Sequence, residues 1–281
     1  MWLRTLAGLL IVALPTTTLA EGDKNVLAIG GSVTEIIYAL GEGDRLIGRD
    51  STSSYPPEAA SLPDVGYMRA LAPEGVLSVR PGMIISEDGA GPPETIEVLQ
   101  AADIPFITVP GSYSVEGIVQ KILTVGEALD VEAASIALAS DVRMKLQEAE
   151  AAADALAGET PKRVLFVLST QDGRIMASGT NTAASSIIEM AGSVNAVTGF
   201  EGYKPMSDEA VIAAAPDVIL MMDRRGDHFV ANEDLFALPA IAATPAAQTQ
   251  SVVRMNGLYL LGFGPRTADA VLELTTSLYK G

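Results

Sequence analysis

Short apolar runs alternate with amphipathic stretches along most of the chain. The apolar runs have the length and the β-branched content of buried strands, and apolar positions at helical spacing follow them. The predicted strands are Val26–Ile29, Leu46–Gly48, Met83–Ser86, Phe106–Val109, Arg163–Leu168 and Val218–Met222, with Ser251–Arg254 and Tyr259–Leu261 as further candidates. The predicted helices cover residues 32–40, 73–79, 93–102, 182–191 and 208–215 and the stretch after Pro265. This alternation predicts largely parallel sheets that are covered by helices on both faces.

One segment interrupts the alternation. Residues 114–156 contain no proline, are rich in Ala, Leu and Glu, and form a much longer helical pattern than their neighbours, although Asp130 could begin a second helix. We therefore predict an α/β protein with two Rossmann-like lobes and parallel-rich sheets, joined by one long backbone helix. The boundaries are an N-terminal lobe over 21–112, a linking helix over 113–158 and a C-terminal lobe over 159–281. The alternative, one large doubly wound domain, leaves the long helix unexplained.

The first twenty residues have the pattern of a secretory signal peptide. Arg4 supplies the positive start, Leu6–Leu14 is a short apolar run, and Thr18–Ala20 offers a cleavage site before Glu21. The apolar run is shorter than the roughly 20 residues that span a bilayer, and no later segment of the sequence is long and apolar enough to do so. We predict cleavage after residue 20, with a retained N-terminal anchor as the alternative.

The composition of the chain and the motifs that it lacks exclude several classes of function. The sequence has no cysteine, which excludes disulfides, thiolate metal sites and a lipidated cysteine. We therefore expect a protein that is free in the periplasm. We also expect it to be a monomer. The formal net charge of -17 excludes nucleic-acid binding through the general field of the protein. His228 is the only histidine, and the sequence lacks a P-loop, a nucleophile elbow and a complete dinucleotide motif at Gly30-Gly31. These absences favour a binding protein, and an enzyme acting on a periplasmic small molecule is the less favoured alternative.

The stretch from Leu62 to Leu71 carries the most informative chemistry. Tyr67 and Arg69 are two residues apart, so an extended segment would project both to the same side. A nearby cation favours the phenolate form of a tyrosine, and an anionic oxygen is a good axial ligand for ferric haem iron. Arg69 would stabilise that phenolate or pair with a haem propionate. The alternative is a tyrosine packed at the edge of a lobe beside a solvated arginine.

Several segments together resemble the periplasmic haem-binding proteins of bacterial haem-uptake systems. These segments are Ile29–Gly41, Gly66–Leu71, Ala177–Ala183, Gly199–Met206 and Leu261–Arg266. The resemblance covers essentially all of the chain after residue 20, and the wider class also binds cobalamin and siderophores. It implies that the protein takes part in iron acquisition by binding haem b as its transported ligand. It also implies an ABC permease and ATPase of the inner membrane as partners, Tyr67 as the axial haem ligand and Arg69 as its neighbour.

Some relatives carry a histidine after the first strand of the second lobe, but Leu168–Gly173 contains none. We therefore predict five-coordinate iron held by Tyr67 alone. His228 is a candidate sixth ligand, and its alternative is a loop histidine in solvent.

The remaining candidate residues each have two interpretations. Arg224, Arg225 and Lys204 would pair with propionates, or Lys204 would lie along the surface. Tyr203 would stack on the porphyrin or fill the core of the lobe. Met68 and Met206 would line an apolar pocket or simply pack.

Two glutamates lie at corresponding helix starts in the two lobes. By resemblance, Glu74 and Glu209 would dock onto arginines of the permease. Acids at helix N-termini are also favoured by the helix dipole, and both explanations can hold together. A ferric siderophore or cobalamin is the alternative cargo for the same architecture.

Overall fold

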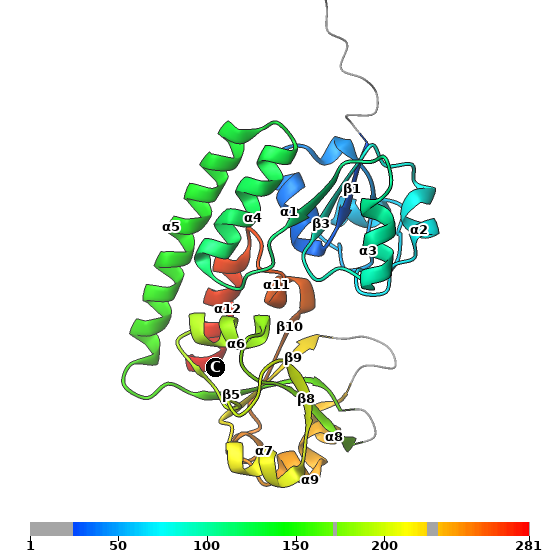
Figure 1. Cartoon of the computed structure of the whole chain (residues 1–281). Coiled ribbons are helices and arrows are strands. Elements are labelled where there is room, and N and C mark those ends of the chain that lie inside the picture. Colours follow the sequence, from blue (N-terminus) through cyan, green and yellow to red (C-terminus); the bar gives the residue numbers. More distant parts are fainter. Residues whose placement is uncertain (1–24, 171–172, 224–229, 281) are drawn as a thin grey trace, which may run out of the picture.

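The first four predicted strands form the sheet of the N-terminal lobe in the computed structural model, which describes residues 25–170, 173–223 and 230–280 (Figure 1). All neighbouring strands in this sheet are parallel, and their order is β2-β1-β3-β4. The strands are β1 (Val26–Ile29), β2 (Leu46–Arg49), β3 (Met83–Glu87) and β4 (Phe106–Val109). The helices of this lobe are α1 (Gly31–Ala39), η2 (Gly43–Arg45), η3 (Pro57–Ser61), α2 (Pro73–Ser78) and α3 (Pro93–Gln100).

Alternate residues of β1 show how this sheet is covered on both faces. Val26 and Ala28 pack with α1 and the helix that follows the lobe, whereas Leu27 and Ile29 pack with Val76 of α2 and Leu99 of α3. This is the period of two that a buried strand requires. The predicted α/β fold with helices on both faces is therefore confirmed.

The C-terminal lobe repeats the plan with a mixed sheet. Its strand order is β10-β9-β5-β6-β8, and β7 also pairs with β5. The β6 strand runs antiparallel to β5 and to β8, whereas β9, β10 and β7 are parallel to their partners. The strands are β5 (Arg163–Ser169), β6 (Ile175–Ser178), β7 (Val194–Asn195), β8 (Tyr203–Met206), β9 (Val218–Asp223) and β10 (Val252–Asn256). The helices are α6 (Ala183–Met190), α7 (Asp208–Ala214), α8 (Asn232–Ala237), α9 (Pro239–Ala242), α10 (Pro245–Thr249), α11 (Gly257–Leu261) and α12 (Thr267–Tyr279).

The prediction of a strand at Tyr259–Leu261 is wrong, because this stretch belongs to α11. Asn256 ends β10 and caps the helix, since its side-chain oxygen accepts a hydrogen bond of 3.0 Å from the Tyr259 backbone N–H. Side-chain capping of this kind starts a helix in a sequence that is otherwise apolar enough for a strand.

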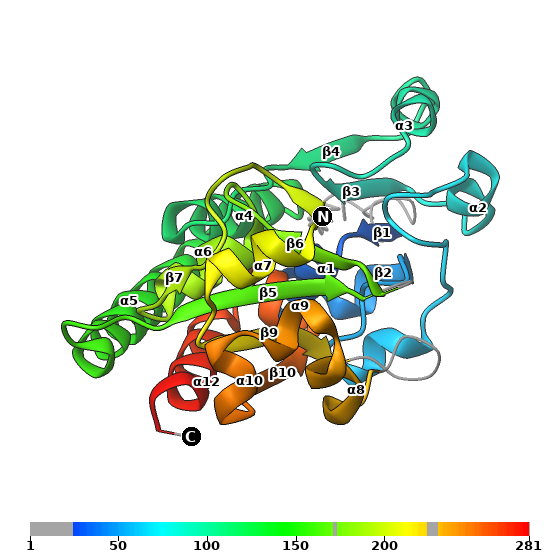
Figure 2. The same cartoon turned by 90° about the horizontal axis from the view of Figure 1, so that it is seen from below.

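The linking segment consists of two helices, so the single helix predicted over 113–158 is wrong and the alternative, a second helix beginning near Asp130, is confirmed. They are α4 (Val115–Ala128) and α5 (Glu132–Ala157), and Asp130 between them has a left-handed backbone with φ 59°. At 1.5 Å per residue, the 26 residues of α5 span about 39 Å. Figures 1 and 2 show α5 along one side of the molecule, from the N-terminal to the C-terminal lobe. Within the described residues, no helix is both long and apolar enough to cross a bilayer.

Charged side chains also join the lobes. Lys121 of α4 is fully buried, and its Nζ donates to Glu87 Oε1, to Ser32 Oγ at 3.0 Å and to the Gly262 carbonyl at 3.4 Å. Arg266 donates to Glu35 Oε2 at 2.9 Å and stacks over the ring of Tyr55. Ser32, Glu35 and Glu87 belong to the N-terminal lobe, whereas Gly262 and Arg266 follow α11. The Glu35–Arg266 ion pair and the Lys121–Gly262 hydrogen bond therefore join the N-terminal lobe and α4 to the segment after α11, in addition to α5.

Candidate ligand-binding site

Tyr67 lies on the loop between β2 and α2, and 49% of its surface is exposed. Its backbone is held on both sides. Before it, the Gly66 carbonyl accepts a hydrogen bond of 2.9 Å from the Ser51 N–H. After it, the Met68 carbonyl accepts one of 2.8 Å from the Gly91 N–H. The loop thus presents an accessible phenol on a backbone that is tied to two neighbouring segments.

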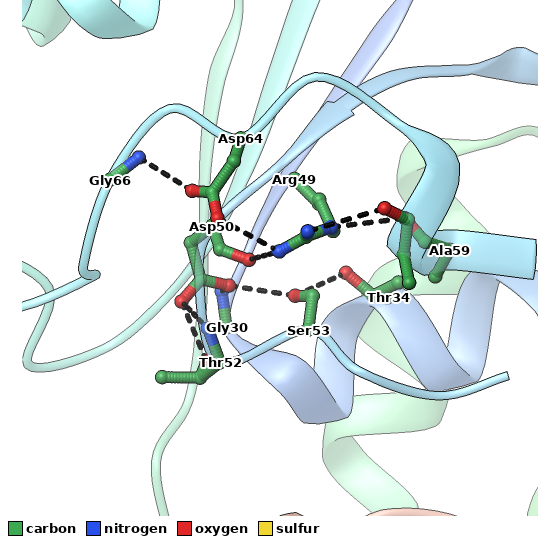
Figure 3. Close-up of polar contacts among 10 residues, drawn as sticks. Gly30, Thr34, Arg49, Asp50, Thr52, Ser53, Ala59, Asp64 and Gly66 are labelled. Carbon is green, nitrogen blue, oxygen red and sulfur yellow. Dashed lines mark hydrogen bonds and ion pairs between the residues drawn. The ribbon is translucent and has the colours of Figure 1, made fainter. Parts of the chain in front are cut away.

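A polar network around the end of β2 supports this loop (Figure 3). Asp50 is fully buried and accepts hydrogen bonds from the Gly30 N–H, from the Thr52 N–H and hydroxyl, and from the Ser53 hydroxyl. Arg49 pairs with Asp64 at 3.1 Å. Asp64 in turn accepts from the Gly66 N–H at 2.9 Å, directly before Tyr67.

The extended geometry predicted for Tyr67 and Arg69 is wrong. The Ala70 N–H donates to the Tyr67 carbonyl at 2.8 Å, which closes a turn over residues 67–70. The turn forms because Leu71 also donates to Gly91, so the chain must bend back towards the loop before α3. The exposed Arg69 lies on this turn.

The pKa of Tyr203, on β8 of the opposite lobe, responds to several neighbouring groups. Burial raises the pKa of Tyr203 above its ordinary value, and the neighbouring Tyr113 adds to the rise. Hydrogen bonds with Thr182 and Ala184 lower that pKa, and so does the positive charge of Arg69. The charge of Arg69 on the N-terminal loop thus acts on a phenol of β8, as the last and smallest of these effects.

Tyr203 fills part of the core, because its half-buried ring packs edge-on against Phe166 with the ring centroids 6.2 Å apart. Its neighbour Lys204 is exposed, and the Lys204 ammonium lies 5.5 Å from the centre of the Phe200 ring. Stacking on a porphyrin and pairing with a propionate remain predictions for these two residues.

The two methionines are half-buried. Met68 packs against the apolar cluster beneath α2 and α3, and Met206 packs against the cluster beneath α7 to α10. Packing thus accounts for part of each side chain, and a pocket-lining role for either stays a prediction. Arg224, Arg225 and His228 lie outside the described residues, as does the predicted signal peptide over residues 1–20.

Glu74 and Glu209 are exposed in the first turns of α2 and α7, as the sequence predicted. The pKa of Glu209 is lowered by a hydrogen bond from its own backbone N–H and by one from Ser207. Each carboxylate thus lies on the surface of a different lobe and at the positive end of a short helix. Docking on a permease stays a prediction for both.

Sequence reasoning missed the buried ion pair between α4 and the N-terminal lobe. Lys121 had a recognisable signal, because it lies three residues after Ile118 and four before Val125, on the apolar face of α4. A lysine at a buried helical position requires a partner. The partner, Glu87, is at the end of β3, and only the fold brings it there.

Comparisons with known proteins agree with this architecture. The chain is 40% identical to a periplasmic heme-binding protein, BhuT, solved in complex with two hemes, with a TM-score of 0.85 over 91% of this chain and 97% of that one. It is 37% identical to the periplasmic heme-binding protein RhuT from Roseiflexus sp. RS-1 in apo form, with a TM-score of 0.84 over 91% and 98% of the two chains.

A vitamin B12-binding protein of Vibrio cholerae is 27% identical over 91% of this chain and 89% of its own length. These similarities confirm the resemblance that the sequence segments indicated. The family model described as periplasmic binding protein matches residues 26–257, and the chain therefore belongs to the periplasmic binding protein family.

Proposed function

We propose that this chain captures haem b between its lobes and delivers it to an ABC importer of the inner membrane. The observation that carries the proposal is Tyr67, a half-exposed phenol on a tied loop within a fold whose relatives include heme-binding proteins. The Tyr67 oxygen would coordinate the ferric iron as a phenolate. The apolar faces of the porphyrin would be removed from water between the lobes, which supplies most of the affinity.

Cations around Tyr67 would complete the recognition of the ligand. Arg69 would favour the phenolate form of Tyr67 and pair with a propionate, and Lys204 would offer a second cation from the opposite lobe. The positive charge of Arg69 lowers the pKa of Tyr203 in the opposite lobe, which supports a place for Arg69 on the side of the loop that faces the ligand.

Delivery would need only a small change in the angle between the lobes. The helix α5 and the Glu35–Arg266 ion pair between the lobes oppose a wide hinge motion. Glu74 and Glu209 would dock on basic residues of the permease, one from each lobe, and docking would pry the lobes apart. The protein would act in the periplasm, after cleavage of residues 1–20 and as a free monomer.

A haemin titration of the mature protein tests the proposal. Wild type should show a saturable Soret shift and tyrosinate-to-iron charge-transfer bands, and Tyr67→Phe should lose those bands because only the hydroxyl is removed. Tyr55→Phe is the matched control, since Tyr55 is also an exposed tyrosine of the same lobe. Equal spectra for wild type and Tyr67→Phe would refute the assignment of the ligand.

Cobalamin is the second candidate, because a vitamin B12-binding protein is among the relatives. Saturable binding of cyanocobalamin with no binding of haemin would favour it over haem. A ferric siderophore would be tested in the same titration format.

A further inference from the structure

We infer that Asp50 positions Tyr67 for ligation through the backbones of its neighbours Arg49 and Ser51. This inference rests on the proposed function and names a residue that does not itself touch the ligand. Asp50 follows β2 and is fully buried. The hydrogen-bond donors that it meets are neutral groups of two segments: Gly30 before α1, and Thr52 with Ser53 in the loop after β2 (Figure 3).

Asp50 constrains the groups around it because its carboxylate is buried. A buried anion without hydrogen-bond donors strongly destabilises the folded protein. Asp50 therefore holds its donors in place. The Gly30 N–H at 2.9 Å fixes the start of α1, and the Thr52 N–H at 2.8 Å fixes the loop that leaves β2. Ser53 is held on its other side by the Thr34 hydroxyl at 2.7 Å.

The residues on either side of Asp50 connect it to the segment that carries Tyr67. Arg49 and Ser51 flank Asp50, and their backbones bond to the chain just before Tyr67: the Val65 N–H donates to Arg49, and the Ser51 N–H donates to Gly66, both at 2.9 Å. The Thr52 hydroxyl donates its one proton to Asp50 Oδ2 at 2.6 Å, and its oxygen lies 4.0 Å from the sulfur of the Met68 side chain. Asp50 thus sets the position of the backbone before Tyr67, whereas Gly91 holds the backbone after it.

Asparagine cannot make the hydrogen bonds that Asp50 makes. Its Oδ1 accepts from the Gly30 backbone N–H, and its Oδ2 accepts from the Thr52 backbone N–H. An asparagine has only one acceptor oxygen, so its NH₂ group must face one of these N–H groups. Neither N–H can turn to become an acceptor, and one of the two segments must therefore move.

The test combines haemin titration with hydrogen exchange of the ligand-free protein. Asp50→Asn should bind haemin about 10- to 100-fold more weakly with altered charge-transfer bands, which is the range for residues that orient a metal ligand. It should also accelerate amide exchange in residues 63–70. Thr52→Val should weaken binding about 2- to 10-fold through the loss of one hydroxyl contact, and Thr52→Ser should behave as wild type.

Tyr279→Phe is the control for a general loss of stability. The Tyr279 hydroxyl donates to the Gly192 carbonyl and accepts from the N–H of Lys162, the residue before β5. This variant should unfold at a lower temperature without changing the bands or the exchange of residues 63–70.

Several outcomes would overturn the inference. Unchanged bands and unchanged exchange of residues 63–70 in Asp50→Asn would do so, and so would equal changes in Tyr279→Phe. If Asp50→Asn fails to fold, weaker haemin binding by Thr52→Val than by Thr52→Ser would support the inference. Equal haemin binding by these two variants would overturn it. If wild type does not bind haemin, the proposed function fails, and the exchange data still report on whether Asp50 positions the loop.

Discussion

The buried ion pair of Lys121 and Glu87 makes a prediction about stability. Lys121→Met keeps an unbranched apolar side chain of similar length but removes the ammonium that bonds to Glu87, Ser32 and Gly262. Glu87 then retains the Ser32 hydroxyl, at 3.0 Å, but loses its cation. The Glu87 side chain is only 15% exposed, so water replaces the lost partner incompletely.

The expected cost of Lys121→Met follows from this geometry. Breaking a buried pair from one side costs about 3–5 kcal/mol, and the small exposure of Glu87 favours the lower end, about 3 kcal/mol. For a protein of this size, such a loss lowers the Tm by about 6–12 °C. Lys121→Met combined with Glu87→Gln should recover part of the loss, because no unpaired charge stays buried.

Thermal and urea unfolding of the four proteins in this double-mutant cycle measure the coupling between the two residues. A loss below about 1 kcal/mol for Lys121→Met would refute the reasoning, because it would mean that the protein tolerates an unpaired Glu87. Additive losses in the double variant would also refute it, because they would show that the two side chains do not act as a pair.

Three further predictions concern single elements. Burial, followed by nearby acids, raises the pKa of Tyr259 to about 12, so wild type should lose stability as pH rises from 10 towards 12, and urea unfolding of Tyr259→Phe should show less of this loss. Asn256→Ala should cost about 1 kcal/mol in thermal unfolding through loss of the α11 cap, and an unchanged Tm would contradict that role. Glu74→Ala with Glu209→Ala should leave haemin affinity unchanged but abolish haem uptake in reconstituted vesicles, and undiminished uptake would refute docking.

The sequence predicted the fold well because strand burial is a local signal. Val26–Ile29 and Phe106–Val109 were predicted with the bounds that the structure has, since the first is an uninterrupted apolar run and the second is broken only by the β-branched Thr108. The β8 strand was missed because it contains the exposed Lys204 and Pro205, and β6 was missed because its apolar run, Ile175–Ala177, is only three residues long. The α11 helix was mistaken for a strand because its start depends on a single side-chain cap.

The candidate site was predictable only in part. The sequence picked out Tyr67 as a chemically suitable loop residue, and the structure leaves it half-exposed. The turn that separates Tyr67 from Arg69 depends on hydrogen bonds to Gly91, which is distant in sequence. Likewise, the buried position of Asp50 follows from contacts with Gly30 and Ser53 that no local pattern announces.

The most direct test of the central claim is the haemin titration of the mature wild-type protein beside Tyr67→Phe. The account predicts saturable binding by wild type, with tyrosinate-to-iron charge-transfer bands that Tyr67→Phe lacks. Absence of saturable haemin binding by wild type, or the same bands in both proteins, would contradict it.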